Sequence, residues 1–438
     1  MKARILALAG LLVAVGTTGA LEARTPAAGM QQEADTLRLA TVLAEARATN
    51  PLLRASRLKA DADRERVPQA GALPDPQLSL GFVNRPVRDF TRTDQMMTLN
   101  RVMFAQRFPW PGKLGFGEER ARHLAEAGVL DAAETEVALL ARVASVYYRI
   151  AYMDRALAIM EETRDLLRDF LDVTSAMYSV GTGLQQDVLQ AQVAVASMTE
   201  DITVVEQDRV AMASRLNALL GRAATTPIGA LELPGPTGPL PSADSLMERA
   251  ASRRPALRAA RARVKAAEAG YRAARRALYP DFTVGVGYGQ RPQFDDLATL
   301  EVGISVPLWA GARQLPMRRE MAAMRAMEEA KELDLYNETF ARLTELRADA
   351  ERARSLAELY ATSVLPQARA AVESALSAYR VGRVDYMTLV ENEMTVNRYE
   401  IESVRLVAEY QGALAGVEAL LGTRLEDPRM QTGAGGDR

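Results

Sequence analysis

The sequence predicts a mainly helical protein with two pairs of short β-strands, built from two similar halves. Three observations lead to this fold class. Short motifs return in the same order about 200 residues later, long stretches carry apolar residues at helical spacing, and two pairs of segments alternate between apolar and polar residues. A repeated arrangement of this kind is typical of a pseudo-symmetric assembly, and it gives no sign of a catalytic pocket.

The internal two-fold repeat rests on short motifs that keep their order. Each motif is weak alone, and only the ordered set carries the inference. The matching pairs are Tyr178-Ser179-Val180-Gly181 with Tyr379-Arg380-Val381-Gly382, Ala218-Leu219-Leu220-Gly221 with Ala419-Leu420-Leu421-Gly422, Pro51-Leu52-Leu53-Arg54-Ala55 with Pro255-Ala256-Leu257-Arg258-Ala259, and Pro74-Asp75 with Pro280-Asp281.

We expect the chain to divide at these repeats and at a Pro- and Gly-rich stretch between Pro234 and Pro241. The expected divisions are a signal peptide over 1–23, a first repeat over 36–230, a linker over 231–242, a second repeat over 243–425 and a solvated tail over 426–438.

Composition excludes several classes of function. The chain of 438 residues has a net charge of -2, which argues against nucleic acid held by a basic face. It has no Cys, so a disulfide, a thiolate metal site and a lipid anchor on an N-terminal Cys are not expected. His123 is the one His, so a His-rich metal site cannot form. We therefore predict no cofactor, no metal site and no enzyme activity.

The N-terminus has the pattern of a secretory signal. Lys2 and Arg4 precede an apolar run from Ile5 to Val15, and small residues at Thr18-Gly19-Ala20 offer a cleavage site, with Ala23 as a second candidate. The alternative is an uncleaved membrane anchor. No later run of 18 apolar residues exists, so the exported protein is either soluble in the periplasm or inserted as a β-barrel.

The first repeat should open with two helices, over about 36–48 and 51–69, followed by two strands. The first strand, about 76–84, alternates well, with Leu78, Leu80 and Phe82 on one face. The second, about 97–108, alternates poorly, and Arg101 stands where an apolar residue would be expected.

A helical hairpin over about 115–221 should complete the first repeat. Apolar residues of its first arm recur at an average spacing of 3.5, which is typical of a coiled-coil seam. From Gly115 to Met177 the helix would be roughly 90 Å long. Gly181 and Gly183 permit the turn to the return helix. The seam residues are Leu139, Val143, Val146, Ile150, Met153, Leu157 and Met160.

The second repeat follows the same plan with clearer strands. They are expected over about 281–290 and 299–308, each alternating between an aliphatic face and a face of small and polar residues such as Gly285 and Glu301. A second helical hairpin should cover about 312–422, and Pro366 should kink or split its first arm.

Each of the two strands of the second repeat is about long enough to cross a bilayer as a tilted strand. Four strands cannot close a barrel, and an open edge in lipid leaves backbone groups unpaired. Three copies would supply twelve strands and close a lumen. The alternative is a soluble sandwich with one buried face.

The ordered set of motifs resembles the TolC-like outer membrane factor family, over nearly the whole mature chain. Its signals are the duplicated layout, the segment Phe108-Pro109-Trp110-Pro111-Gly112-Lys113 and the paired Tyr-x-Val-Gly turns. The resemblance implies a homotrimer with a twelve-stranded β-barrel in outer-membrane lipid of a Gram-negative cell, continued by a long α-helical coiled-coil barrel in the periplasm. It also implies a periplasmic adaptor protein and an inner-membrane pump as partners.

The resemblance further implies roles for the two hairpin tips. In that family the tips meet the adaptor; the matching residues here are Tyr178, Val180, Gly181, Thr182, Tyr379, Val381, Gly382 and Arg383. Just past the tips, family members narrow the tunnel with acidic rings. The matching gate candidates are Asp187, Thr388 and Glu391, with Asp385 nearby, and Thr388 departs from the usual carboxylate. Crowded carboxylates would attract cations, so Glu391→Ala should weaken cation preference.

The substrate and the pump are less constrained than the fold. The Pro-Trp-Pro-Gly-Lys segment is similar to that of the branch associated with heavy-metal pumps of the resistance–nodulation–division class. Drug efflux and type I secretion stay open. A rival from another class is a soluble periplasmic coiled-coil adaptor, which would need a lipoyl-like β domain between its hairpin arms. Another is a secreted enzyme centred on His123.

Three features are interpreted as structural. Met317, Met321, Met324 and Met327 fall near helical spacing, and we expect core packing in preference to copper binding. His123 is expected on the surface. The glycines of Gly285-Val286-Gly287-Tyr288-Gly289 suit a strand better than a nucleotide loop, because no helix start or Lys-Ser/Thr pair follows.

Overall fold

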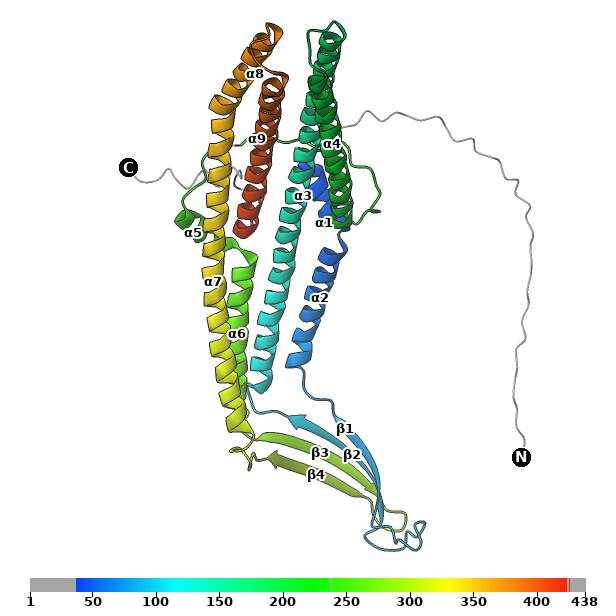
Figure 1. The fold of residues 1–438 in the computed structure, drawn as a ribbon. Helices are drawn as coiled ribbons and strands as arrows, with labels where there is room; N and C mark the ends of the chain where they lie inside the picture. Colours follow the sequence, from blue (N-terminus) through cyan, green and yellow to red (C-terminus); the bar gives the residue numbers. More distant parts are fainter. Residues whose placement is uncertain (1–36, 237, 424, 426–438) are drawn as a thin grey trace, which may run out of the picture. The chain divides into compact units, whose positions relative to one another are not determined.

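The computed structural model describes residues 37–236, 238–423 and 425. The expected signal peptide and tail lie outside these residues. The described part is mainly helical, with one four-stranded antiparallel sheet, and the same order of elements occurs twice (Figure 1). No helix within the described ranges is long and apolar enough to cross a membrane.

The first half contains two short helices, two strands and a helical hairpin. These are α1 (Leu39–Thr49), α2 (Pro51–Gly71), β1 (Gln77–Val83), β2 (Leu99–Phe108), α3 (Lys113–Ser179) and α4 (Gln185–Leu220). The second half consists of α5 (Ala243–Arg253), α6 (Pro255–Arg276), β3 (Asp281–Gln290), β4 (Leu297–Ser305), α7 (Gln314–Leu359), a π-helical turn η1 (Tyr360–Val364), α8 (Leu365–Arg380) and α9 (Tyr386–Leu421).

The expected elements are present, with differences at their ends. The last strand stops at Ser305, three residues before the expected end, because Pro307 has no N–H to donate to a ladder. The second long helix is interrupted near Pro366, as predicted. There the Leu365 N–H bonds to the Tyr360 carbonyl, five residues back, which gives one π-helical turn before α8.

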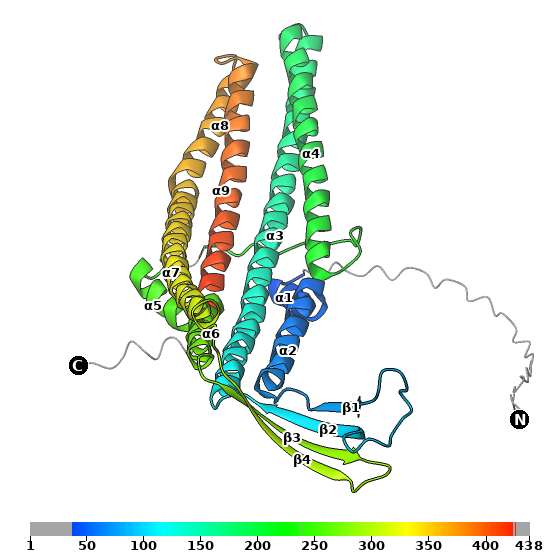
Figure 2. The ribbon, with the colours of Figure 1, turned by 90° about the horizontal axis from the view of Figure 1, so that it is seen from below.

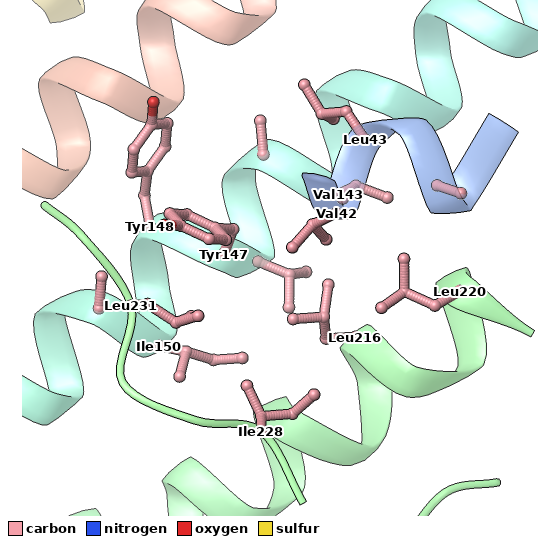
Figure 3. Close-up of a cluster of buried hydrophobic side chains, with 14 of the residues drawn as sticks. Val42, Leu43, Val143, Tyr147, Tyr148, Ile150, Leu216, Leu220, Ile228 and Leu231 are labelled. Atoms are coloured by element: carbon pink, nitrogen blue, oxygen red, sulfur yellow. The ribbon is translucent and has the colours of Figure 1, made fainter. Parts of the chain in front are cut away.

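The long helix α3 carries the main core on a stripe wider than the predicted seam. Leu139, Val143 and Ile150 are buried as expected, but Tyr147 and Ala151 beside them are also buried. These residues pack against α1, α4 and the segment that follows α4 (Figure 3). The Tyr147 hydroxyl donates to the Leu37 carbonyl at 2.7 Å and accepts from the Glu232 N–H at 3.0 Å, so its polar tip is satisfied.

In each half the return helix ends against the start of another helix, and this explains two of the repeated motifs. Gly221 ends α4 with a φ of 68°, and Gly422 ends α9 with a φ of 69°. A Cβ on Gly221 would lie 3.0 Å from the Thr49 carbonyl oxygen, and one on Gly422 would lie 3.2 Å from Pro255. Glycine at each junction therefore lets two helices meet end to end alongside the long helix.

The four strands lie in the order β1-β2-β3-β4 (Figure 2). Alternation divides the sheet into two faces. The apolar face carries Leu78, Leu80, Val102, Phe104, Val284, Val286, Leu300 and Val302, and the polar face carries Ser79, Gly81, Arg101, Met103, Thr283, Gly285, Gly287, Thr299 and Glu301. Most of the aliphatic side chains on the apolar face are exposed in the single chain.

The sheet is tied to the helices by one buried carboxylate. Asp281, at the start of β3, contacts Arg107 and Lys113 at 2.6 Å each and accepts from the Trp110 N–H at 2.9 Å. The Trp110 ring stacks on Tyr279. The Pro-Trp-Pro-Gly-Lys segment therefore anchors the point where β2 gives way to α3.

Candidate docking tips and gate

Both hairpin tips use the same turn. The Thr182 N–H bonds to the Met177 carbonyl at 2.9 Å, and the Gly181 N–H bonds to the Tyr178 carbonyl at 3.0 Å. The second tip repeats this pair of bonds one for one, from Arg383 and Gly382. The two central glycines have φ values of 77° and 70°. Both turns are therefore Schellman motifs, in which glycine supplies the left-handed residue.

The tips expose valine side chains and differ in their tyrosines. Val180 is 73% exposed and Val381 is 66% exposed, and Thr182 and Arg383 beside them are also exposed. Tyr178, however, is 48% exposed, whereas its counterpart Tyr379 is only 7% exposed.

The tyrosines beside the second tip are buried against the first hairpin. Tyr379 and Tyr386 lie in a cluster with side chains from α3 and α4, and their rings meet edge to face at 6.0 Å. Burial raises the pKa of Tyr386 to about 12, and Tyr379 and the charge of Asp187 add to the effect. Burial and Asp187 also raise the pKa of Tyr379. The charge of the candidate Asp187 thus acts on two tyrosines of the second hairpin.

Asp385 and Thr388 interact with each other at the start of α9. Asp385 is the N-cap, and its carboxylate accepts from the Thr388 N–H at 2.9 Å and from the Thr388 hydroxyl at 2.5 Å. These two bonds lower the pKa of Asp385. Glu391, about one turn further along, is exposed and has no ion-pair partner within the described ranges. Asp187 also has no ion-pair partner within these ranges, but it is only partly exposed, so Glu391 is the exposed and unpaired carboxylate of the four gate candidates.

One further acidic residue near the tips was not predicted from the sequence. Glu393 is 8% exposed and lines a cavity of about 540 Å³ between α3, α8 and α9. Burial raises its pKa, and Glu400 and Glu162 raise it further. The sequence does contain a signal for the burial of Glu393, because the apolar stripe of α9 runs from Leu389 through position 393 to Val396.

The cavity also contains groups of opposite charge and a buried polar contact. Arg155 and Arg369 line it, and Arg369 pairs with Glu400 at 2.5 Å. Below Glu393, the Asn397 amide donates to the Thr163 hydroxyl at 2.8 Å, and both side chains are buried. This contact joins α9 to α3 just beyond Met160, the last residue of the predicted seam.

An open apolar groove borders the two tips. It has a volume of about 610 Å³ and lies between α4 and α9. Leu189 and Val193 of α4 are largely exposed along it, and Met387 of α9 completes its lining. The exposed valines of the tips thus lie close to a further strip of apolar surface on α4.

The residues that the sequence pattern indicated to be structural lie in different environments. His123 is partly exposed on α3, with Nδ1 3.4 Å from Glu126. The glycines of 285–289 lie in β3, as expected. The expected core packing of the Met ladder holds only in part, because Met321 is partly buried near Gly270 of α6, whereas Met317, Met324 and Met327 are exposed. Spacing predicted one helical face correctly, and α6 covers only part of it, where Met321 and Met324 line a cavity with Gly270.

Known proteins with similar sequences are outer membrane efflux proteins. The family described as "Outer membrane efflux protein" matches residues 42–222 and 246–423. The pyoverdine export outer membrane protein OpmQ of Pseudomonas putida is 25% identical over 334 residues, which are 72% of this chain and 68% of that protein. The Pseudomonas aeruginosa OpmQ is 25% identical over 318 residues, 68% of this chain and 64% of its own length.

Solved structures share the fold at lower identity. The outer-membrane channel OprN superposes with a TM-score of 0.72 at 19% identity, covering 88% of this chain and 89% of OprN. CusC gives 0.74 at 18% identity, covering 88% and 92%. The outer membrane protein VceC of Vibrio cholerae gives 0.75 at 17% identity, covering 89% and 97%. At these identities the likeness shows the arrangement of helices and strands.

Proposed function

The chain belongs to the outer membrane efflux protein family, and on this premise we propose that it is the passive exit duct of a tripartite efflux system. An energised inner-membrane pump and a periplasmic adaptor protein would deliver the substrate. The duct would do no chemistry, and its substrate would move down a gradient once the tips open. The rival reading as an adaptor is wrong, because the family is that of the outer-membrane channel.

The sheet carries the proposal. Leu80 is 76% exposed and Leu300 is 73% exposed on its apolar face, which suits contact with lipid and not with water. Within the described residues β1 pairs only with β2, and β4 only with β3. Unpaired edges in lipid cost several kcal/mol per backbone group. Three copies would pair these edges and close a twelve-stranded barrel, which the hairpins would continue as a helical tunnel.

Docking of the adaptor is assigned to the exposed parts of the tips. Val180, Gly181 and Thr182 in the first tip and Val381, Gly382 and Arg383 in the second are accessible in the single chain. Tyr178 adds an exposed ring to the first tip. Tyr379, which the family resemblance also assigns to docking, is buried, so its part would be to hold the second tip in place.

The gate is assigned to the first turns past the tips. Glu391 would supply the acidic ring, because it is the exposed and unpaired carboxylate of the four candidates. Asp385 and Thr388 would hold the start of α9, and Asp187 would link the two hairpins. Glu391→Ala should reduce the cation preference of single channels, whereas Thr388→Asp should increase it. Unchanged selectivity in both variants would remove the gate role from this turn.

The substrate class is a finer proposal. The Pro-Trp-Pro-Gly-Lys segment favours metal cations delivered by a pump of the resistance–nodulation–division class, with drug efflux and type I secretion as the other routes. A second candidate rests on the two OpmQ relatives, which are named for pyoverdine export. Deletion of the gene should raise sensitivity to metal salts under the first proposal. It should leave pyoverdine inside the cell under the second.

Membrane fractionation with native mass determination tests the duct itself. A trimer in the outer-membrane fraction, followed by stepwise conductance in planar bilayers, is the expected result. A soluble periplasmic monomer would contradict the barrel, and the strand pairs would then form a small sheet of a soluble protein.

A further inference from the structure

Two charged residues on the polar face of the sheet have no partner in the described part of the chain. These are Arg101 of β2 and Glu301 of β4, and both are exposed. The nearest comparable pair on this face, Arg107 with Asp281, is joined at 2.6 Å. Glycines flank Arg101 on both neighbouring strands, because Gly81 and Gly289 stand opposite it. Space is open beside Arg101 on the Gly81 side, where a Cβ would meet nothing within 4 Å, whereas Leu99 and Leu297 lie close to Gly289.

The two hairpins of the sheet have equivalent registers. In β1–β2, Leu78 faces Phe104, and in β3–β4, Val284 faces Val302. Residues of β1 and β3 are related by an offset of 206, which is the offset between Asp75 and Asp281. Residues of β2 and β4 are related by an offset of 198, which is the offset between Pro109 and Pro307. These two offsets convert the first pair into the second. The same offsets hold along the hairpin. The β2–β3 contact is thus a template for a contact between β4 and the β1 of another copy.

This template gives one register for the joining of copies. Inside the chain, Met103 of β2 faces Gly287 of β3. The equivalent positions are Glu301 of β4 and Gly81 of β1 in the next copy. On its other side Gly81 faces Arg101. One row across the junction therefore reads Glu301, then Gly81, then Arg101, with only a glycine between the opposite charges.

The geometry inside the chain shows that a long side chain can lie over such a glycine. The Met103 sulfur lies 3.3 Å from where a Cβ on Gly287 would stand, and the Thr299 Cβ lies 3.4 Å from it on the other side. At the junction, Glu301 corresponds to Met103 and Arg101 to Thr299. Their strands would be about 10 Å apart, which the two long side chains can span by leaning toward each other over Gly81.

We propose that Arg101 of one copy and Glu301 of the adjacent copy form an ion pair over Gly81, and that this pair sets the register in which the copies join. The proposal rests on the proposed barrel. It assigns the open edges of the sheet to contact with a second copy of this chain, because the charges of Arg101 and Glu301 are complementary.

Other registers lose this pair. A slip of one residue would place the apolar face of one copy beside the polar face of the next. A slip of two residues would place Glu301 opposite Ser79 or Val83, whose neighbours on β2 are Met103 and Leu99. Neither neighbour carries a charge, so only the template register joins the two unpaired groups.

Cysteine cross-linking tests the register, because the natural chain has no Cys. In the proposed register Val302 stands opposite Leu80 of the next copy. The double variant Val302→Cys with Leu80→Cys should therefore give disulfide-linked trimers under a membrane-permeant oxidant. Leu78→Cys or Phe82→Cys in place of the Leu80 change gives matched controls, which are displaced by two residues and out of disulfide reach. All these positions are on the apolar face, away from the proposed ion pair.

The outcomes distinguish a failure of the proposed register from a failure of the proposed barrel. Stronger linking through Leu78→Cys or Phe82→Cys would overturn the register while leaving the barrel intact. A trimer with no linking in any of the three variants would also overturn the register. A monomer by native mass, without cross-links, would instead remove the proposed function on which the inference rests.

Charge exchange tests the ion pair itself. Arg101→Glu and Glu301→Arg should each lower the temperature at which the detergent-extracted trimer dissociates, and the double exchange should restore it. Gly81→Leu should cause a similar loss. A Cβ at Gly81 meets nothing within 4 Å in the single chain, so that variant blocks the pair without crowding the chain's own fold. A double exchange no better than the single variants would refute the pair.

Discussion

The two hairpin tips share one turn but have different surroundings. Each ends its first helix with the same pair of backbone bonds around a left-handed glycine. Yet the tyrosine three residues before that glycine is exposed in the first tip and buried in the second. The residues that follow also differ, since Gln185 at the start of α4 is exposed while its counterpart Tyr386 is 1% exposed.

The comparison separates what local sequence determines from what neighbours determine. The Val-Gly motif is sufficient for the turn, because the left-handed residue and the two carbonyls it satisfies lie within a few residues. The fate of each tyrosine depends on packing across the two hairpins, where Tyr379 and Tyr386 meet side chains of α3 and α4. In the single chain the tyrosine of the first tip is therefore left exposed, and that of the second tip is held against the neighbouring hairpin.

The largest expected difference is between two equivalent tyrosine substitutions. Tyr379→Ala should lower the free energy of opening of the second hairpin by about 3 kcal/mol, because it removes a buried ring. Tyr178→Ala should change the stability of the first hairpin by less than about 0.5 kcal/mol, because its ring is half exposed. Hydrogen exchange of the amides in α8 and α4 would measure both. Equal losses would mean that the tips are equivalent in the assembled protein.

A smaller effect should be equal at both tips. Gly181→Ala and Gly382→Ala should each cost about 1–2 kcal/mol, because both glycines have positive φ and a Cβ there meets nothing else. Gly183→Ala should cost more than Gly181→Ala, since its Cβ would lie 3.0 Å from the Tyr178 nitrogen. The opening free energies of the two hairpins report these losses. A marked inequality between Gly181→Ala and Gly382→Ala would contradict a shared turn.

The arrangement of elements could be predicted from the sequence because it depends on spacing along the chain. Alternation identified three of the four strands, the apolar repeat identified the long helices, and Pro366 identified the interruption before α8. Spacing does not say which neighbour covers an apolar face. The Met ladder of α7 was expected in the core, yet three of its four side chains are exposed in the single chain, since periodicity does not distinguish burial within a chain from burial against another copy.

The candidate site was predictable to a smaller extent, for the same reason. The glycines of the tips follow from local conformation. The role of Asp385 as N-cap was also accessible, because an Asp three residues before Thr388 at a helix start is a capping pattern. The approach of Asp187 to the tyrosines depends on how two hairpins far apart in the sequence pack together. No pattern within one hairpin contains that information.

The smallest expected effect concerns a carboxyl that only the second hairpin has. Glu393 is buried in α9, whereas its counterpart in α4 is Gln192, which is exposed and neutral. Because folding raises the Glu393 pKa above its ordinary 4.5, the folded hairpin holds this proton more tightly than the unfolded one. Ionisation of Glu393 therefore destabilises the folded hairpin. This loss of stability is absent below pH 4.5, grows as the pH rises from there through the raised pKa of the folded state, and persists above it.

Glu393→Gln removes this penalty and makes the two halves alike at this position. We expect the variant to stabilise the second hairpin by about 1 kcal/mol at neutral pH and to leave it unchanged in acid. Gln192→Glu, at the exposed counterpart, should have no effect at either pH. Hydrogen exchange of α9 at two pH values measures the difference. A neutral-pH loss of stability in Glu393→Gln would instead mean that the ionised carboxylate is held by Arg155 or Arg369, which line the same cavity.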